Sequence, residues 1–327
     1  MKRILITGSG GFIGSHTVEF FLEKKFFVRA FVHYNSNNNI GWLANINSKN
    51  KKNLEIYFGD IRDEKNTEKS FKNIDYVIHL AALIGIPYSY YSPRSYIETN
   101  IIGTYNVLES SLKNKIKRLL TTSTSEVYGS ALYIPIKEDH PLQGQSPYSA
   151  TKIGADKLAE SYFKSFNLPL TIVRPFNTFG PRQSTRAIIP TIITQLLLSN
   201  TLKIGTASTK RDFNYVTDTV NAFYKILNCK KLIGKEVNVC TEQNISINKL
   251  INEISAILNK KNKIIYESKR MRPEKSEVNN LIGSCKLLKK YTRWKSNISL
   301  RDGLSKTICW YKNPDNLKYF SKEDYSI

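Results

Sequence analysis

Cysteine and histidine are scarce in this sequence. Its 327 residues include four cysteines without a C-x-x-C pair, and four histidines without the spacing of metal ligands. Disulfide frameworks are typical of short, cysteine-rich secreted chains, so we predict free thiols in the core rather than disulfides, and no metal site. The cysteines are Cys229, Cys240, Cys285 and Cys309.

Long apolar runs are also absent. No run approaches the roughly 18–20 residues that a membrane-spanning helix needs. Residues 1–8 are basic and then apolar, as in a signal peptide, but glycines end the apolar run after a few residues. We therefore expect a cytoplasmic protein with no membrane partner.

Acidic residues are fewer than basic ones, 27 against 49, and the formal net charge is +22. A nucleic-acid-binding protein would have such a charge, with lysine clusters such as those at 49–52, 113–118 and 286–290 as its contact surface. However, the lysines are dispersed along the chain, and there is no basic tail or nucleic-acid-binding motif. We expect a basic, solvated surface, no nucleic-acid partner, and an anionic small-molecule substrate that accounts for part of the charge.

The first half of the chain alternates short apolar runs with longer amphipathic ones. This alternation is typical of βαβ units on a parallel sheet. The segment 35–53, rich in Asn, Ser and Lys, is predicted to be a loop with one helical turn around Trp42. Strands are predicted at residues 2–7, 27–33, 54–58, 76–80, 118–122 and 170–174, and helices at 12–24, 95–112 and 147–166.

The pattern is looser in the second half. Together the two halves predict an α/β fold, a doubly wound parallel sheet of the Rossmann type with a smaller C-terminal α/β substrate lobe. We expect a first domain at 1–175 and a lobe at 176–327, with segments of the lobe returning to the first domain. The lobe has predicted helices at 188–198, 218–227, 247–258 and 300–310, and short strands at 237–239 and 263–266.

Three glycines, Gly8, Gly11 and Gly14, lie between the first predicted strand and the first predicted helix. In a strand–turn–helix unit, this spacing allows a tight turn, close approach of the backbone to a pyrophosphate, and close helix packing. The helix then begins at Phe12-Ile13, and its N-terminus faces the phosphates. The motif predicts dinucleotide binding by the first domain.

The acidic residue that usually contacts the adenosine ribose is missing. No Asp or Glu occurs between residues 24 and 54, so Asn35 or Ser36 is the candidate for this contact. No arginine lies in the glycine-rich segment to receive a 2′-phosphate, which favours NAD over NADP. Asp60 and Ile61, after the third strand, are expected to cover the adenine, with Asp60 accepting a hydrogen bond from its amino group.

Tyr148 and Lys152 are four residues apart in a predicted helix, so both side chains project from one face. A lysine ammonium beside a phenol lowers the phenol's pKa from its ordinary value of about 10. We therefore predict that Tyr148 takes the proton of an alcohol under oxidation and that Lys152 lowers the pKa of Tyr148.

Four motifs together resemble the extended short-chain dehydrogenase/reductase family. They are the three glycines, the segment 79–82 (His-Leu-Ala-Ala), Tyr148-x-x-x-Lys152, and the segment 174–177 (Arg-Pro-Phe-Asn). Their order and spacing match over nearly the whole chain. The resemblance implies a Rossmann domain that binds NAD, a lobe that binds a nucleotide-activated sugar, and a homodimer. It also implies that the cofactor is contacted by Leu80, Ala81, Ala82 and Asn100, and that Lys152 holds the nicotinamide ribose.

Glu126, in the segment Thr124-Ser125-Glu126, separates two classes within this family. Members that only epimerise carbon 4 have a small neutral residue there, whereas sugar 4,6-dehydratases have Glu. Oxidation at carbon 4 makes a ketone that acidifies the proton on carbon 5, so a carboxylate can remove it while the carbon-6 hydroxyl leaves as water. Hydride then returns to carbon 6. The resemblance implies an NAD-dependent nucleotide-sugar 4,6-dehydratase, which is a hydro-lyase.

The neighbours of Glu126 complete the predicted catalytic group. Thr124 is expected to hydrogen-bond the 4-oxygen of the sugar. Ser125 stands where glucose-type dehydratases have Asp, so we expect Glu126 to act as both base and acid. UDP-glucuronate decarboxylases resemble the chain at 124–126 and at 177–182, and they remain an alternative, as does a nucleotide-sugar epimerase.

Longer segments, at 143–149, 186–193 and 211–216, resemble the N-acetylglucosamine 4,6-dehydratases that begin legionaminic-acid synthesis. This resemblance implies conversion of GDP-N-acetylglucosamine to its 4-keto-6-deoxy sugar, with UDP-N-acetylglucosamine or another hexose as the alternative. Arginine forks match phosphate oxygens. The implied ligands of the substrate diphosphate are Asn177, Arg211 and Arg272, with Arg182 as a further candidate.

Overall fold

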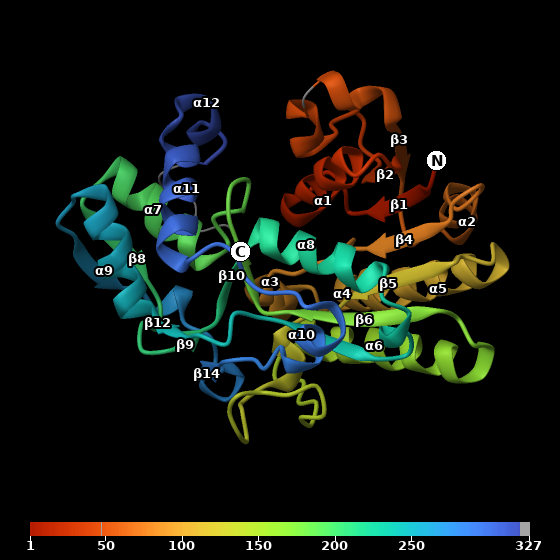
Figure 1. Ribbon diagram of the computed structural model, residues 1–327. Helices are drawn as coiled ribbons and strands as arrows, with labels where there is room; N and C mark the ends of the chain where they lie inside the picture. The colour runs from red at the N-terminus through yellow and green to blue at the C-terminus, as the bar shows by residue number, and fades with distance from the viewer. Residues whose placement is uncertain (47, 321–327) are drawn as a thin grey trace.

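The computed structural model describes residues 1–46 and 48–320. Its centre is a seven-stranded parallel sheet in the order β11-β6-β5-β4-β1-β2-β3 (Figure 1). The strand order reverses at β1, which places a topological switch point at the carboxyl end of that strand. The strands are β1 (Arg3–Thr7), β2 (Phe27–His33), β3 (Leu54–Gly59), β4 (Tyr76–His79), β5 (Arg118–Thr122), β6 (Leu170–Pro175) and β11 (Glu236–Val239).

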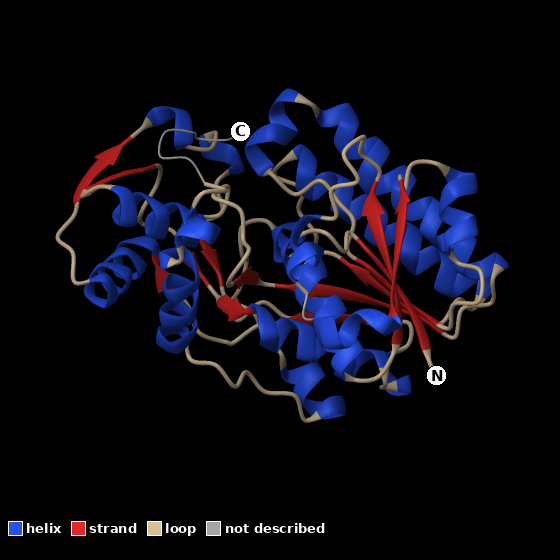
Figure 2. Ribbon diagram, turned by 90° about the horizontal axis from the view of Figure 1, so that it is seen from above, coloured by secondary structure: helices blue, strands red, loops and turns tan. Residues whose placement is uncertain are grey.

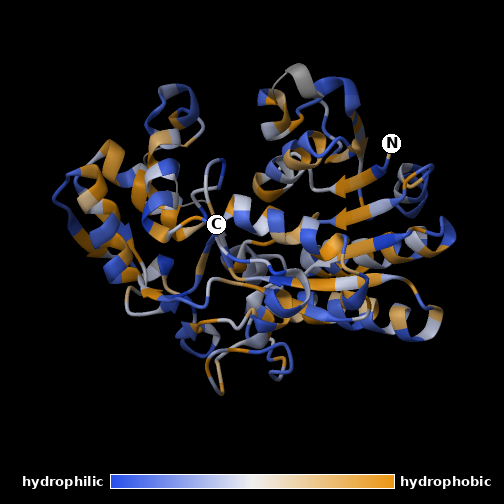
Figure 3. Ribbon diagram, viewed as in Figure 1, coloured by the Kyte–Doolittle hydropathy of each residue, from blue (hydrophilic) through white to orange (hydrophobic). Residues whose placement is uncertain are grey.

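Each face of this sheet has its own hydrophobic core, because successive residues of a strand point to opposite faces. Ile4 and Ile6 of β1 belong to one core and Leu5 to the other. Helices cover both faces (Figure 2), and hydrophobic residues run along the strands between them (Figure 3). The doubly wound α/β fold is confirmed. The first core includes residues of α1 (Phe12–Glu23) and α8 (Val216–Leu227), and the second includes residues of α5 (Gly103–Lys113) and α6 (Pro147–Phe166).

A smaller lobe has a third core, built on three helices and short strands. The helices are α7 (Ile188–Leu198), α9 (Ile247–Leu258) and α11 (Leu300–Lys312). The strands form the pairs β7 (Asn177–Phe179) with β10 (Phe213–Tyr215) and β8 (Thr201–Ile204) with β13 (Lys263–Tyr266), and the sheet β12 (Ile245–Ser246)-β9 (Lys210–Arg211)-β14 (Asn280–Leu281).

Segments from the second half of the chain return to the central sheet. Strand β11 pairs with β6 as the last strand, and α8 packs on α1 with α10 (Lys286–Thr292) beside it. The central sheet thus draws on both halves of the chain. The boundary at residue 175 stays a prediction.

The helix predicted at 95–112 is divided in the structure. It consists of α4 (Pro93–Tyr96), a π-helical stretch at Ile97–Ile102, and α5. A π turn contains an extra residue, which reorients the side chains within it, and such turns are frequent at functional sites. Asn100 lies in this stretch. The periodicity of the sequence did not reveal the interruption, because a π turn shifts the pattern by a single residue.

The segment 35–53 contains the predicted turn at Trp42, as a 3-10 helix at Gly41–Asn45. A second 3-10 helix at Ser48–Asn53 was not predicted, and residue 47 lies outside the described part. The Trp42 ring packs on Trp310 of α11, with ring centroids 5.3 Å apart, and its backbone N–H donates to Gly10 at 3.0 Å. This segment therefore joins the glycine-rich turn to the lobe.

Other short elements were also missed, because a few residues are too short for a periodic pattern. They include α2 (Glu64–Ser70), α3 (Ile86–Tyr91), α12 (Pro314–Leu317) and 3-10 helices at Ser125–Tyr128, Lys230–Leu232, Ser268–Arg270 and Glu274–Ser276.

The cysteines carry free thiols, but they are not all in the core. Cys240 and Cys285 are buried, Cys229 is half-buried and Cys309 is exposed on α11, so the predicted burial is wrong for Cys309. Within residues 1–46 and 48–320, every helix is too short or too polar to cross a bilayer.

Candidate active site

The glycine-rich turn connects β1 to α1 at the switch point of the sheet. Gly8 has φ +69°, and a Cβ there would lie 2.8 Å from the Ala81 nitrogen. A Cβ on Gly14 would lie 2.1 Å from the Gly8 oxygen, so the helix packs directly on the turn. Gly11 differs, because the nearest atom that its Cβ would meet is the Gly8 oxygen at 3.4 Å.

The N-terminus of α1 suits an anion. Gly11 is its N-cap and supplies no side-chain acceptor, and the first turn, which begins at Phe12 and Ile13, contains no acidic residue. The N–H groups of this turn are therefore available to a pyrophosphate, whose charge the helix dipole favours. The turn and the helix fit the dinucleotide predicted from the sequence.

The carboxyl ends of β1 and β4 are tied together through Thr7. Its hydroxyl oxygen accepts hydrogen bonds from the backbone N–H of Leu80 at 3.0 Å and of Ala81 at 3.1 Å. The Thr7 proton is then left to donate to Nδ1 of His79, 2.8 Å away. This arrangement sets the position of Leu80 and Ala81, with partly buried Ala82 after them, at the predicted cofactor edge.

His79 continues this connection to the catalytic helix. Because Nδ1 accepts a hydrogen bond, the ring proton is on Nε2, which donates to the Thr104 hydroxyl at 3.1 Å. The Thr104 hydroxyl in turn donates to the Asn100 carbonyl oxygen at 2.6 Å. The Asn100 side chain accepts from the N–H of Leu83 and donates to its carbonyl oxygen and to Thr151 of α6. Asn100 thus supports the segment that follows β4 and connects it to α6. Its predicted contact with the cofactor stays a prediction.

Asp60 follows β3 as predicted, but its carboxylate already has a partner. Both oxygens accept from the Arg62 guanidinium, with Nε 3.0 Å from each. This hydrogen bonding lowers the pKa of Asp60, so the residue is a carboxylate at neutral pH. Ile61 is buried beside it and its carbonyl oxygen accepts from Asn106 at 2.8 Å. Contacts of either residue with adenine stay a prediction.

Tyr148 and Lys152 lie on one face of α6, as their spacing predicted, and both side chains are buried. Burial beside Ile86 and Tyr96 raises the pKa of Tyr148 well above its usual value, and a hydrogen bond with Thr124 opposes this. The prediction that Lys152 lowers this pKa stays a prediction.

Lys152 is itself buried and has other partners. Its ammonium donates to the carbonyl oxygen of Thr122 at 2.6 Å. Burial lowers the pKa of Lys152, while the negative charge of Asp156 opposes this. Lys152 is thus held at the carboxyl end of β5, next to the predicted proton-transfer residues.

Asp156 is a buried acid for which no role was predicted. It accepts from Ser123 at 2.9 Å and from Nε of Arg174 at 3.1 Å. Burial raises the pKa of Asp156, and the Arg174 and Lys152 charges oppose this. One signal was in the sequence, because Asp156 follows Lys152 by one helical turn and so shares its face.

The segment 124–126 follows β5 directly. Thr124 caps the 3-10 helix at Ser125–Tyr128 by accepting from the Glu126 N–H at 3.2 Å. Ser125 is buried. Glu126 lies close enough to Tyr148 for its charge to raise the phenol's pKa, after the larger effects of burial and of the Thr124 hydrogen bond. The structure therefore brings Thr124, Glu126 and Tyr148 together.

Two arginines of the lobe that are predicted to bind the substrate lie near Glu126. Arg272 donates to Oε2 of Glu126 at 3.3 Å. Arg211 of β9 pairs with Glu277 at 3.3 Å, and the charge of Glu126 also acts on it. Asn177 of β7 is adjacent in the lobe, where its side chain donates to the carbonyl oxygen of Asp212 at 3.3 Å. Arg211 and Arg272 thus lie within electrostatic reach of the catalytic group.

Arg182 lies elsewhere. Its guanidinium forms two hydrogen bonds with Glu19 of α1, at 2.8 and 2.9 Å, and a third with Ser15 at 3.2 Å. The structure thus joins Arg182 to the helix that faces the predicted cofactor phosphates rather than to the Arg211–Arg272 pair. Its predicted contact with the substrate diphosphate stays a prediction.

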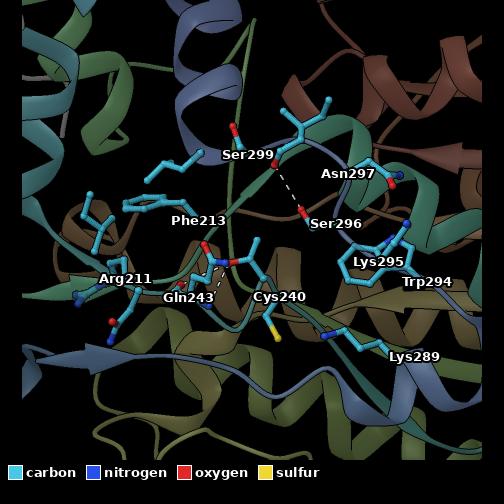
Figure 4. A pocket seen from close by; sticks show the side chains of 15 residues that line it. Arg211, Phe213, Cys240, Gln243, Lys289, Trp294, Lys295, Ser296, Asn297 and Ser299 are labelled. Carbon is cyan, nitrogen blue, oxygen red and sulfur yellow. Dashed lines mark hydrogen bonds between the residues drawn. The ribbon is translucent and has the colours of Figure 1, made fainter. Parts of the chain in front are cut away.

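A cavity of about 540 Å³ lies beside β9 (Figure 4). Arg211 and Phe213 line one side and Trp294 and Lys295 the other. Arg211 is the one predicted site residue among those that line it. In the described ranges, no group of three or more His, Cys, Asp or Glu side chains could hold a metal ion.

Comparison with known proteins places the chain in a family. The family model described as GDP-mannose 4,6 dehydratase matches residues 5–307. The chain belongs to this family. A relative, the dTDP-D-glucose 4,6-dehydratase of Dictyostelium discoideum, is 34% identical in an alignment that covers 97% of this chain and 83% of the relative.

Two solved structures share the fold. The dTDP-glucose 4,6-dehydratase of Bacillus anthracis, in complex with NAD, is 27% identical with a TM-score of 0.85. The match covers 96% of this chain and 98% of the dehydratase chain. The UDP-glucose 4-epimerase of Thermotoga maritima, with UDP-glucose, is 27% identical with a TM-score of 0.85. The match covers 95% of this chain and 98% of the epimerase chain.

These findings confirm the resemblance to extended short-chain dehydrogenases/reductases and, at the level of the family, the prediction of NAD. They include both 4,6-dehydratases and an epimerase. The narrower group implied by legionaminic-acid synthesis, the homodimer and the cytoplasmic location stay predictions.

Substitution of Gly11 tests the cofactor site. A Cβ at Gly11 has room in the protein but would occupy space at the helix N-terminus, so Gly11→Ala should fold and lose at least about tenfold in NAD affinity. Isothermal titration with NAD measures this. Gly14→Ala is the contrast, because its Cβ collides with the turn and should lower stability itself. Unchanged NAD affinity in Gly11→Ala would contradict the assignment.

His79 should make stability depend on pH. Burial lowers the pKa of His79 from 6.5 to about 3, so the unfolded chain binds a proton in this range that the folded protein does not. Stability is therefore fully present above about pH 6.5 and falls as the pH decreases, by at most about 1.4 kcal/mol per pH unit. Urea unfolding from pH 7 to pH 5 should show a smaller loss for His79→Gln than for the wild type. Equal losses of unfolding free energy in the two proteins would show that His79 does not contribute to the pH dependence.

Proposed function

We propose that this protein is an NAD-dependent nucleotide-sugar 4,6-dehydratase. The observation that carries the proposal is a carboxylate, Glu126, beside the buried Tyr148 and its hydrogen-bond partner Thr124. A sugar oxidase or epimerase needs the tyrosine and the threonine but no acid at this point. The 4,6-dehydratases among the relatives support the same reaction.

In this proposal, Tyr148 takes the proton of the carbon-4 hydroxyl while Thr124 hydrogen-bonds the oxygen. NAD, when bound, supplies the hydride acceptor for carbon 4, the hydride donor for carbon 6 and the positive charge of its oxidised ring. Glu126 removes the carbon-5 proton and passes it to the carbon-6 hydroxyl, which leaves as water. When carbon 6 receives the hydride, carbon 5 receives a proton from solvent, and Tyr148 releases to solvent the proton that it took. The product is the 4-keto-6-deoxy sugar.

The raised pKa of Tyr148 bears on the first step. Burial keeps the phenol protonated in the protein alone, so proton transfer needs further positive charge near it. Lys152 lies one turn away on α6, and it is the residue expected to hold the nicotinamide ribose. Gly8, Gly11 and Gly14 would hold the pyrophosphate at the N-terminus of α1.

For the substrate we propose GDP-N-acetylglucosamine, with the same reaction on UDP-N-acetylglucosamine or another hexose as the alternative. Arg211 and Arg272 support a diphosphate-linked sugar, since two guanidinium groups lie near the catalytic acid. The homodimer predicted from the family resemblance is part of the proposal, with pairing through 95–112 and α6.

The Glu126→Gln variant tests the proposed reaction. It should still bind NAD, but it should lose carbon-5 proton exchange in heavy water and water release by a factor of about 10²–10⁴, because the proton acceptor is gone. Mass spectrometry and proton NMR measure both. Glu160→Gln, an equal change of charge on the surface of α6, is the control and should match the wild type. Full dehydration by Glu126→Gln would rule the mechanism out.

A substrate panel separates the candidate functions. The protein is incubated with GDP-, UDP- and dTDP-linked hexoses and N-acetylhexosamines and with UDP-glucuronate, and the products are analysed by mass spectrometry. We expect loss of water, greatest with GDP-N-acetylglucosamine. An isomer of unchanged mass would indicate an epimerase, and loss of carbon dioxide from UDP-glucuronate would indicate a decarboxylase.

A further inference from the structure

A loop of the lobe, residues 271–277, closes over the catalytic group. Its main contacts reach the first domain as well as β9, from four of its seven positions. They are Arg272 with Glu126 at 3.3 Å, the Lys275 carbonyl oxygen with Gln145 at 3.3 Å, Ser276 with Tyr90 at 2.6 Å, and Glu277 with Arg211 at 3.3 Å.

The first of these contacts joins two residues that have different tasks in the proposed reaction. Glu126 must face carbon 5 of the sugar, whereas Arg272 is expected at the diphosphate. In the structure without substrate they are paired with each other, and their side chains are 12% and 24% exposed. The observed pair uses one oxygen of the carboxylate and one nitrogen of the guanidinium, so it directs the two side chains toward each other.

We infer that Arg272 exchanges partners, from Glu126 in the free protein to the diphosphate in the substrate complex, and that this exchange releases the catalytic base. The inference rests on the proposed function. It makes Arg272 a positioning residue for Glu126 in addition to a ligand of the substrate.

Charge and geometry favour the exchange. Glu126 offers Arg272 a single contact at 3.3 Å, whereas a diphosphate offers several oxygens and at least two negative charges to a planar donor fork. Arg211 keeps its own partner, Glu277, on the same loop, so the loop stays attached while Arg272 moves. Glu126 then loses its cation at the moment when a sugar lies beside it.

The exchange has a functional consequence. Proton abstraction would begin only when a nucleotide diphosphate occupies the arginines, so a free hexose would not activate the base. The ion pair would thus couple recognition of the nucleotide end of the substrate to chemistry at the sugar end.

Linkage provides a test that does not depend on turnover. If Glu126 and the diphosphate compete for Arg272, removal of the Glu126 charge must strengthen diphosphate binding. The NAD-loaded protein is titrated calorimetrically with GDP, UDP and dTDP, and the tightest of them is used. We expect Glu126→Gln to bind it about threefold or more tightly than the wild type, in keeping with a partly exposed ion pair.

Two further variants complete the cycle. Arg272→Ala should bind the nucleotide more weakly than the wild type, and in the double variant Glu126→Gln should bring no gain, because the competition is gone. Glu160→Gln controls for the change in net charge and should bind like the wild type.

The outcomes separate the inference from the function on which it rests. Equal or weaker binding by Glu126→Gln, or the same gain in the Arg272→Ala background, would overturn the exchange while leaving the dehydratase proposal intact. Binding of none of the three nucleotides to the wild type would overturn the proposed function and the exchange with it.

Discussion

The hydrogen-bonded chain from Thr7 through His79 and Thr104 to Asn100 supports both halves of the active site. It begins at the carboxyl end of β1, where the strand order reverses and a crevice for a ligand is expected. It ends on the π-helical stretch, whose Asn100 bonds to α6, the helix of Tyr148 and Lys152. Because His79 is buried and neutral, each donor in the chain has one acceptor, and the cofactor edge and the catalytic helix are held in one arrangement.

Burial has two effects in this site. It raises the pKa of Tyr148 and lowers that of Lys152, so both groups are pushed toward their neutral forms. The same burial strengthens the electrostatic effect of every charge that is brought in. A positive charge brought in by a ligand would therefore act strongly on the Tyr148 phenol.

The lobe brings two arginines to the candidate site. Arg211 and Arg272 lie on β9 and on the loop 271–277, and each is paired with a glutamate. Of the two glutamates, Glu126 belongs to the first domain and Glu277 to the lobe itself. An ion pair across the two domains links their positions, and an anionic ligand that competes for the arginine changes that link. The ion pair therefore joins the lobe to Glu126, the proposed catalytic acid.

The sequence by itself determined what depends on local periodicity. Alternating apolar runs identified the sheet and its covering helices, three glycines identified the turn at the switch point, and a spacing of four residues placed Tyr148 and Lys152 on one face. The tertiary structure alone decided the electrostatics. Glu126 and Arg272 are 146 residues apart, Arg182 reaches Glu19 from the lobe, and Tyr148 is buried by residues of other elements. Burial and charge pairing depend on which distant segments meet, and no local pattern contains that information.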